Sequence, residues 1–134
     1  MSRQLDDLSV RVRPQVVELL ARCVEGGIMV LIVETLRTWE EHQANLAKGV
    51  SWIAVSKHLD GATYRQAPRG SDAIDLCPYE TYALHGPDKL RWDESDPIWL
   101  KLGTLGEGVG LRWGGRWAQK DLGHFEYVVP AVNV

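Results

Sequence analysis

The chain has 134 residues, of which 45% are hydrophobic and 25% are charged, and its formal net charge is −3. These values are ordinary for a globular protein and allow a buried core, so we expect a single domain over residues 1–134. No excess of basic residues is present, which argues against a nucleic-acid partner, because such partners usually require a positive surface.

The sequence also argues against membrane insertion and secretion. The longest apolar run, Ile28 to Val33, is too short to span a bilayer. The N-terminus lacks the basic and then apolar segments of a signal peptide. We therefore expect a product that is cytoplasmic as synthesised and makes no stable insertion into a membrane.

The first half of the chain predicts two helices with a strand between them. Apolar residues recur at helical spacing from Val12 to Val24. The run Ile28 to Val33 is rich in β-formers and predicts a strand that is buried on both faces. Thr38 is a suitable cap for a second helix from Trp39 to about Ala47.

The second half predicts loops, two short strands and a third helix. No period is sustained from Ser51 to Gly70, whereas Ala73 to Cys77 reads as a short strand. Tyr79 to Trp92 reads as a surface excursion with a turn at Gly86-Pro87. A helix beginning at Asp93 or Ser95 ends near Gly106 to Gly108, and Phe125 to Val129 forms the last strand. We expect an α+β fold, with helices packed around a small, mostly antiparallel sheet.

Three residues from separate segments have side chains that suit a catalytic zinc ion. His58 lies in the predicted loop, Asp75 on the short strand and His124 just before the last strand. Two imidazoles and a carboxylate leave the fourth position of such a zinc for water. Asp121 is a further carboxylate that could take a proton from that water. Spacing alone is weak support, because lone surface or core histidines are commoner than ligand pairs.

The sequences around these residues form motifs. The pattern S-x-H-x-x-G-x-A-x-D is matched by Ser56, His58, Gly61, Ala73 and Asp75, and the pattern carboxylate-x-x-H by Asp121 and His124. With the segments Thr35 to Glu41 and Trp113 to Trp117, these motifs resemble the VanY-type D-alanyl-D-alanine carboxypeptidases. That zinc peptidase group includes the L-alanyl-D-glutamate endopeptidases of phages and prophages. The resemblance covers about Pro14 to Tyr127.

The resemblance implies a zinc ion held by His58, Asp75 and His124 on the sheet and its adjacent loops, with Asp121 as the base that activates water. It also implies that Arg37, with Ser56, polarises the scissile carbonyl or holds its developing negative charge.

The residues around this set have alternative readings. Without the resemblance, Arg37 reads as a surface charge at a helix start, and Ser56 as a cap for the loop around His58. Trp113 and Trp117 could flank a substrate groove. Glu126 is expected to pair across the sheet or to contact an imidazole.

One departure from the family pattern concerns the carboxylate ligand. The pattern has a single residue between the glycine and the alanine, whereas Ala62 to Asp72 intervene here. This stretch is polar and rich in turn formers, so we expect it to loop out, where it could also line the substrate groove. Asp60 and Asp72 are also near in sequence. We prefer Asp75 because it lies on a predicted strand whose alternate residues share a face, and Asp72 stays open as the alternative.

The remaining histidines and three tryptophans receive simpler interpretations. His42 is expected on the polar side of the second helix and His85 in a turn, both in contact with solvent. Trp39, Trp52 and Trp99 are expected to fill the core.

The resemblance implies an endolysin-like zinc peptidase that cleaves the stem peptides of bacterial peptidoglycan, as an L-Ala-D-Glu endopeptidase or a D-Ala-D-Ala carboxypeptidase. A small one-domain hydrolase is expected to act as a monomer. It would meet the cell wall after release from the cytoplasm. One alternative is a domain of the same fold that binds zinc and wall peptide without cleaving it, although Asp121 argues against this. Another is a structural phage or host protein in which the His and Asp set is coincidental.

Overall fold

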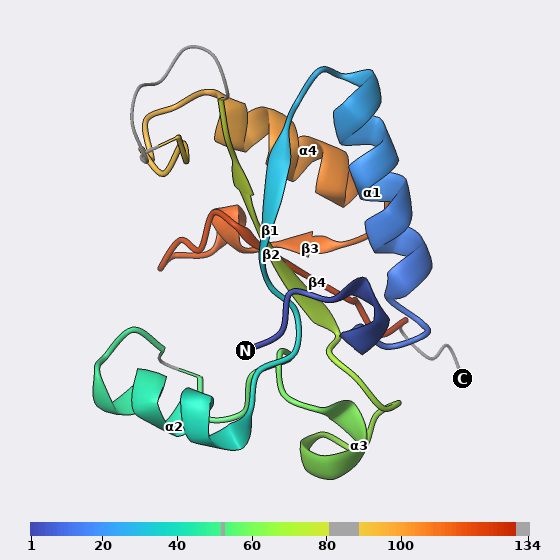
Figure 1. Ribbon diagram of the computed structural model, residues 1–134, viewed down its shortest axis with the longest axis vertical. Helices are drawn as coiled ribbons and strands as arrows, with labels where there is room; N and C mark the ends of the chain where they lie inside the picture. The colour runs from blue at the N-terminus through green and yellow to red at the C-terminus, as the bar shows by residue number, and fades with distance from the viewer. Residues whose placement is uncertain (52, 81–88, 131–134) are drawn as a thin grey trace.

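The computed structural model describes residues 1–51, 53–80 and 89–130. Four antiparallel strands form one sheet in the order β1-β2-β4-β3, with helices around it (Figure 1). The strands are β1 (Val30–Glu34), β2 (Ala73–Pro78), β3 (Arg112–Trp113) and β4 (His124–Glu126). The α-helices are α1 (Arg13–Glu25), α2 (Trp39–Ala47), α3 (Gly61–Tyr64) and α4 (Ile98–Gly108), and short 3-10 turns cover Leu5–Asp7 and Gly114–Arg116. The predicted α+β fold is confirmed.

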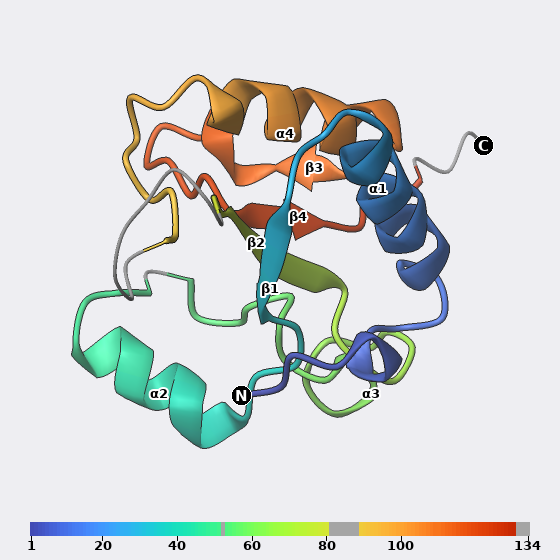
Figure 2. The ribbon, with the colours of Figure 1, turned by 45° about the horizontal axis from the view of Figure 1, so that its top comes forward.

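The core lies between one face of the sheet and the helices α1 and α4, which lie together in Figure 2. Ile74 on β2 and Phe125 on β4 are paired across the strands and fully buried. Helix α4 approaches the sheet very closely at Gly103, where an added Cβ would lie 2.2 Å from the Trp113 ring. One face of the sheet therefore packs against the helices. The residues of β2 and β4 that alternate with the packed ones point to the other face.

Helices α1 and α2 and the end of α4 confirm the predictions. Thr38 forms a capping box with Glu41: its hydroxyl accepts from Glu41 N at 3.1 Å, and Glu41 Oε1 accepts from Thr38 N at 3.0 Å. Helix α4 begins only at Ile98, where Asp96 Oδ1 accepts a hydrogen bond from the Ile98 N–H at 3.0 Å. None of the helices in the described residues is long and apolar enough to cross a membrane.

Three predictions about local structure are wrong. Strand β1 is not buried on both faces, because Leu31 is 43% exposed, whereas Val30 and Ile32 on the opposite face pack against the core. The last strand ends at Glu126 rather than Val129. Trp39 does not fill the core: it is 36% exposed and stacks on Tyr64, with ring centroids 5.1 Å apart.

Other tryptophan and loop predictions have mixed outcomes. Trp99 is buried in the core, as predicted. The stretch from Ser51 to Gly70 is mostly loop but contains the short helix α3. Trp52, His85 and the Gly86-Pro87 turn lie outside the described residues.

The stretch that departs from the family pattern forms a closed loop. Gly61 N donates to Gly70 O at 3.0 Å, and Asp60 Oδ1 accepts from Gly70 N at 2.7 Å. These bonds bring the two ends of the loop together just before β2. As expected, the extra residues are therefore accommodated without disturbing the strand that carries Asp75.

Candidate metal site

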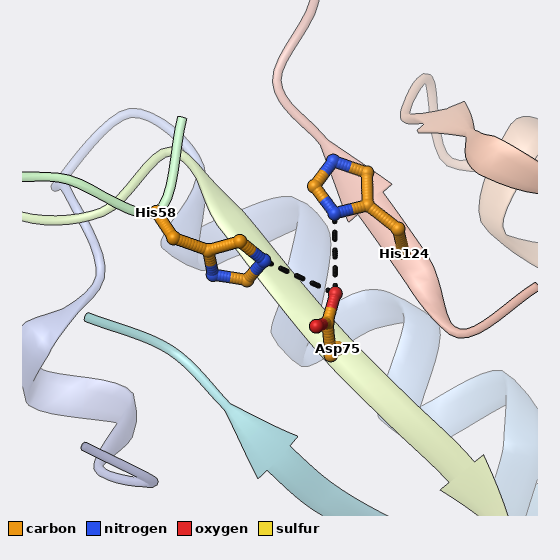
Figure 3. A group of neighbouring side chains, drawn as sticks. All are labelled: His58, Asp75 and His124. Carbon is orange, nitrogen blue, oxygen red and sulfur yellow. Dashed lines mark hydrogen bonds and ion pairs between the residues drawn. The ribbon is translucent and has the colours of Figure 1, made fainter. Parts of the chain in front are cut away.

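The sheet face away from α1 and α4 carries a cluster of two histidines and an aspartate. Asp75 on β2 lies directly opposite His124 on β4, and His58 reaches the same point from the loop before α3 (Figure 3). Asp75 Oδ1 lies 3.1 Å from both His58 Nε2 and His124 Nδ1. One potential ligand atom from each residue lies within 4.8 Å of the others. This arrangement makes the cluster a candidate metal site.

Hydrogen bonds on the outer side of each ring orient the two histidines. His58 Nδ1 lies 2.7 Å from the carbonyl oxygen of Thr35, which can only accept, so Nδ1 carries the proton. His124 Nε2 lies 2.8 Å from Glu126 Oε1, and the Glu126 carboxylate also pairs with Lys57 Nζ at 2.8 Å. Once the inner nitrogens are deprotonated, their lone pairs and the Asp75 oxygen can converge on one metal ion. Such a converging set of two imidazoles and a carboxylate fits a zinc ion.

The charges in the cluster are consistent with cation binding. Burial opposes ionisation of Asp75, but the neighbouring His58 and His124 hold its pKa well below the usual value. Burial opposes protonation of His124, but Asp75 and Glu126 raise its pKa to about 10 in the metal-free protein. A metal ion binding at His124 Nδ1 must therefore displace a proton.

Asp121 lies beside the cluster at the edge of a pocket. Its Oδ2 is 3.9 Å from His124 Nδ1, and its side chain is 40% exposed. Partial burial and the nearby Asp75 raise the pKa of the Asp121 carboxyl above its usual value. Asp121 N donates to Gly114 O at 3.0 Å, and a Cβ at Gly114 would lie 2.4 Å from Asp121 O. The glycine turn after Trp113 thus sets the position of Asp121.

The pocket brings together most of the residues that the sequence nominated. It is lined by Arg37, Ser56, His58, Trp117, Asp121 and His124, together with Val50, Ser51 and Ile53. Ser56 also fulfils the simpler expectation, since its Oγ accepts from His58 N at 3.1 Å.

Comparison with protein families assigns the chain that carries this site to a family. The sequence model of the phage L-alanyl-D-glutamate peptidase family matches residues 1–128 of the chain. The chain belongs to this peptidase family. Its membership confirms the predicted resemblance and the prediction that the protein is a hydrolase. A search of curated proteins gives no significant match.

The structure of this family member places Trp113 away from the pocket, contrary to its expected contact with substrate. The Trp113 ring is buried against α4, and its Nε1 donates to Leu122 O at 2.7 Å. Trp113 lies opposite Phe125 in the strand register and so shares the core face. Trp117 is the aromatic residue at the site, with its ring 5.1 Å from that of His124.

The structure also gives different surroundings to Asp60, Asp72 and Asp75, the three aspartates that are close in sequence. Asp72 lies in a different cluster, where its Oδ2 pairs with Arg11 Nη2 at 2.7 Å and Arg65 Nη1 at 2.9 Å. Asp60 caps α3 through a hydrogen bond from Thr63 N at 3.0 Å. Asp75 is the one of the three that lies between the histidines.

Two residues around Arg37 were missed by sequence reasoning. Arg37 Nε donates to Glu34 Oε1 at 3.0 Å, and Arg37 Nη1 lies 3.2 Å from His42 Nδ1. His42 is fully buried, and its Nε2 lies 2.8 Å from Ile53 O, so the expectation that it contacts solvent is wrong. Its position one turn after the Thr38 cap is the signal that could have indicated a role at the helix entry.

Proposed function

We propose that the protein is a zinc-dependent endopeptidase that cleaves the bond between L-alanine and D-glutamate in peptidoglycan stem peptides. His58, Asp75 and His124 would hold the zinc ion. The observation that carries the proposal is the convergence of these three side chains, beside a pocket, in a member of the L-alanyl-D-glutamate peptidase family. We also propose that residues 1–134 form one catalytic domain and that the protein acts as a monomer.

Asp121 is proposed as the general base. A zinc ion, when bound, would polarise the scissile carbonyl and lower the pKa of a water molecule to about 7. Asp121 Oδ2 lies 3.9 Å from His124 Nδ1, so its carboxylate would be close to a water molecule bound at this site. The carboxylate can accept a proton from that water and then hand it to the leaving amine.

Arg37 and Ser56 are proposed to act on the substrate carbonyl. Both line the pocket. The contacts of Arg37 with Glu34 and His42 fix its guanidinium in place. A fixed positive group near the carbonyl oxygen stabilises the negative charge that develops there, without reorganisation during the reaction.

Digestion of purified peptidoglycan tests the proposal. We expect fragments with a new N-terminal D-glutamate by mass spectrometry, loss of activity with a chelator, and recovery with added zinc. Release of D-alanine instead would indicate a carboxypeptidase. Stoichiometric zinc without any fragment would indicate the non-catalytic binding domain, and no response to chelator would end the metalloenzyme proposal. Access to the wall after release from the cell is part of the same proposal.

A further inference from the structure

A second pocket continues the first one past His124. Both pockets are lined by Ser56, Trp117 and His124, and the second extends to Lys57, Arg112 and Glu126. The two pockets therefore adjoin at the candidate metal site. A substrate whose scissile bond lies at that site can extend in two directions, toward Arg37 in the first pocket or toward Arg112 in the second.

The second pocket has more positive than negative charge. Lys57 Nζ pairs with Glu126 Oε2 at 2.8 Å and donates to Tyr127 O at 3.0 Å. Arg112 lies opposite Glu126 in the strand register, but its Nη1 is 3.7 Å from Glu126 Oε2, beyond hydrogen-bonding distance. The single Glu126 carboxylate thus faces two cations, and Lys57 and His124 already occupy its oxygens.

The Arg112 side chain is 53% exposed at this pocket. A guanidinium presents donors in a planar fork that matches a carboxylate. Arg37, at the other end, is already bonded to Glu34 and His42. Of these two arginines, Arg112 is therefore the one whose guanidinium is open to a carboxylate in a two-point contact, whereas Arg37 keeps its proposed role at the scissile carbonyl.

We propose that Arg112 binds the free carboxylate of the D-glutamate residue and so determines the charge specificity of cleavage. This inference rests on the proposed function. D-Glutamate has two carboxyl groups, and whichever of them continues the stem peptide, the other remains free. When the chain continues through the side chain, the free carboxylate is on the carbon bonded to the scissile nitrogen. The substrate is then oriented with D-glutamate toward Arg112 and L-alanine toward Arg37.

The consequence is a preference for an acidic stem peptide over its amidated form. In the amidated form, D-isoglutamine replaces D-glutamate, and the carboxylate that pairs with Arg112 is lost. We expect the acidic form to bind about tenfold more tightly, which is the effect of one hydrogen-bonded charge pair at a partly exposed site.

Binding of two product-side dipeptides to the zinc-loaded protein tests this inference without requiring turnover. The probes are γ-D-glutamyl-L-lysine and the matching D-isoglutaminyl-L-lysine, titrated by calorimetry. In R112Q, the affinity ratio of the two probes should fall from about ten to about one, and R112K should retain part of the preference. The matched control is R116Q: Arg116 is 55% exposed like Arg112, but it pairs with Glu107 at 2.9 Å and does not line the pocket. This variant should keep the wild-type ratio.

Equal or undetectable binding of the two probes by the wild-type protein overturns the inference, as does a preference that persists in R112Q. The proposed function is tested separately by digestion of peptidoglycan. Cleavage of peptidoglycan without a preference for the acidic probe would exclude the proposed role of Arg112 and still support the peptidase function. The protein could instead prefer the acidic probe through Arg112 and yet cleave no peptidoglycan. That result would support the carboxylate site and exclude the proposed catalytic function.

Discussion

Asp75 and His124 lie directly opposite each other on neighbouring antiparallel strands, with His124 Nδ1 3.1 Å from Asp75 Oδ1. The site therefore depends on the register of β2 against β4. A shift of one residue would turn Asp75 toward the helices and bring Ile74 to the metal-binding face. Burial of Ile74 and Phe125 in the core with residues of α1 and α4 thus fixes the geometry of the cluster as well.

Replacement of Asp75 by Asn should abolish tight zinc binding. The amide keeps the size of the side chain but removes the negative charge between the two histidines. The loss of affinity should exceed the roughly 10- to 100-fold typical of removing a hydrogen-bond partner of a ligand. Zinc content after dialysis and competition with a chelator measure it. Asp60→Asn is the matched control, because Asp60 caps α3, and this variant should bind zinc like the wild type.

Replacement of Asp121 by Asn should remove catalysis and leave zinc bound. The carboxylate is not in the cluster of candidate ligands, whereas a general base contributes about 10²- to 10⁴-fold to the rate. The rate of fragment release from peptidoglycan, measured beside zinc content, checks this. Undiminished hydrolysis would exclude Asp121 as the base, and loss of zinc would instead assign it to the metal site.

Replacement of Glu126 by Gln should weaken zinc binding without abolishing it. The Glu126 carboxylate accepts a hydrogen bond from His124 Nε2 and so keeps Nδ1 free for a metal ion. We expect a loss of about 10- to 100-fold in zinc affinity. Zinc affinity equal to that of the wild type would show that the ring of His124 is held by its packing alone.

The sequence predicted the three clustered side chains because each is embedded in a local motif and two of them lie on strands. Asp75 could be chosen over Asp72 because a run of strand-forming residues places alternate side chains on one face. The bonds of Asp72 to Arg11 and Arg65 connect distant segments, and no local pattern indicates them. Sequence reasoning therefore left this alternative open.

The errors have a common cause, which is that burial depends on tertiary neighbours. Trp113 looked like a groove residue, but Gly103 and Gly115 make room for its ring in the core. His42 looked exposed on a polar helix, yet it is buried against Arg37 and Ile53. Leu31 looked buried in an apolar run, but its side chain is 43% exposed on the face of β1 opposite Val30 and Ile32.

Replacement of Gly103 by Ala should destabilise the fold. In an exposed helix this change stabilises by about 1 kcal/mol. Here the new Cβ would lie 2.2 Å from the Trp113 ring, and overpacking of a core costs about 1–3 kcal/mol. We expect a net loss of up to about 2 kcal/mol in the free energy of unfolding, measured by urea denaturation. Gly108→Ala is the control, since its Cβ would meet the flexible Arg22 side chain at 3.2 Å. An increase in stability for Gly103→Ala would contradict the close approach of α4.

The buried cluster around Asp72 should make the fold sensitive to acid. Burial opposes ionisation of Asp72, but hydrogen bonds from Arg11, Ser9 and Arg65 hold its pKa below the usual value. Because the pKa is lower in the folded state than the unfolded value of about 3.9, the ionised carboxylate stabilises the fold fully above about pH 4. That contribution is lost as the pH falls toward the folded-state pKa.

Asp72→Asn tests this contribution. At pH 7 the variant leaves Arg11 and Arg65 without their shared anion, and we expect its free energy of unfolding to fall by about 3–5 kcal/mol. The difference from the wild type should shrink in urea titrations below about pH 4, where protonation begins to remove the same charge from the wild-type protein. A difference that is equally large at pH 3 and pH 7 would mean that the Asp72 charge does not stabilise the fold.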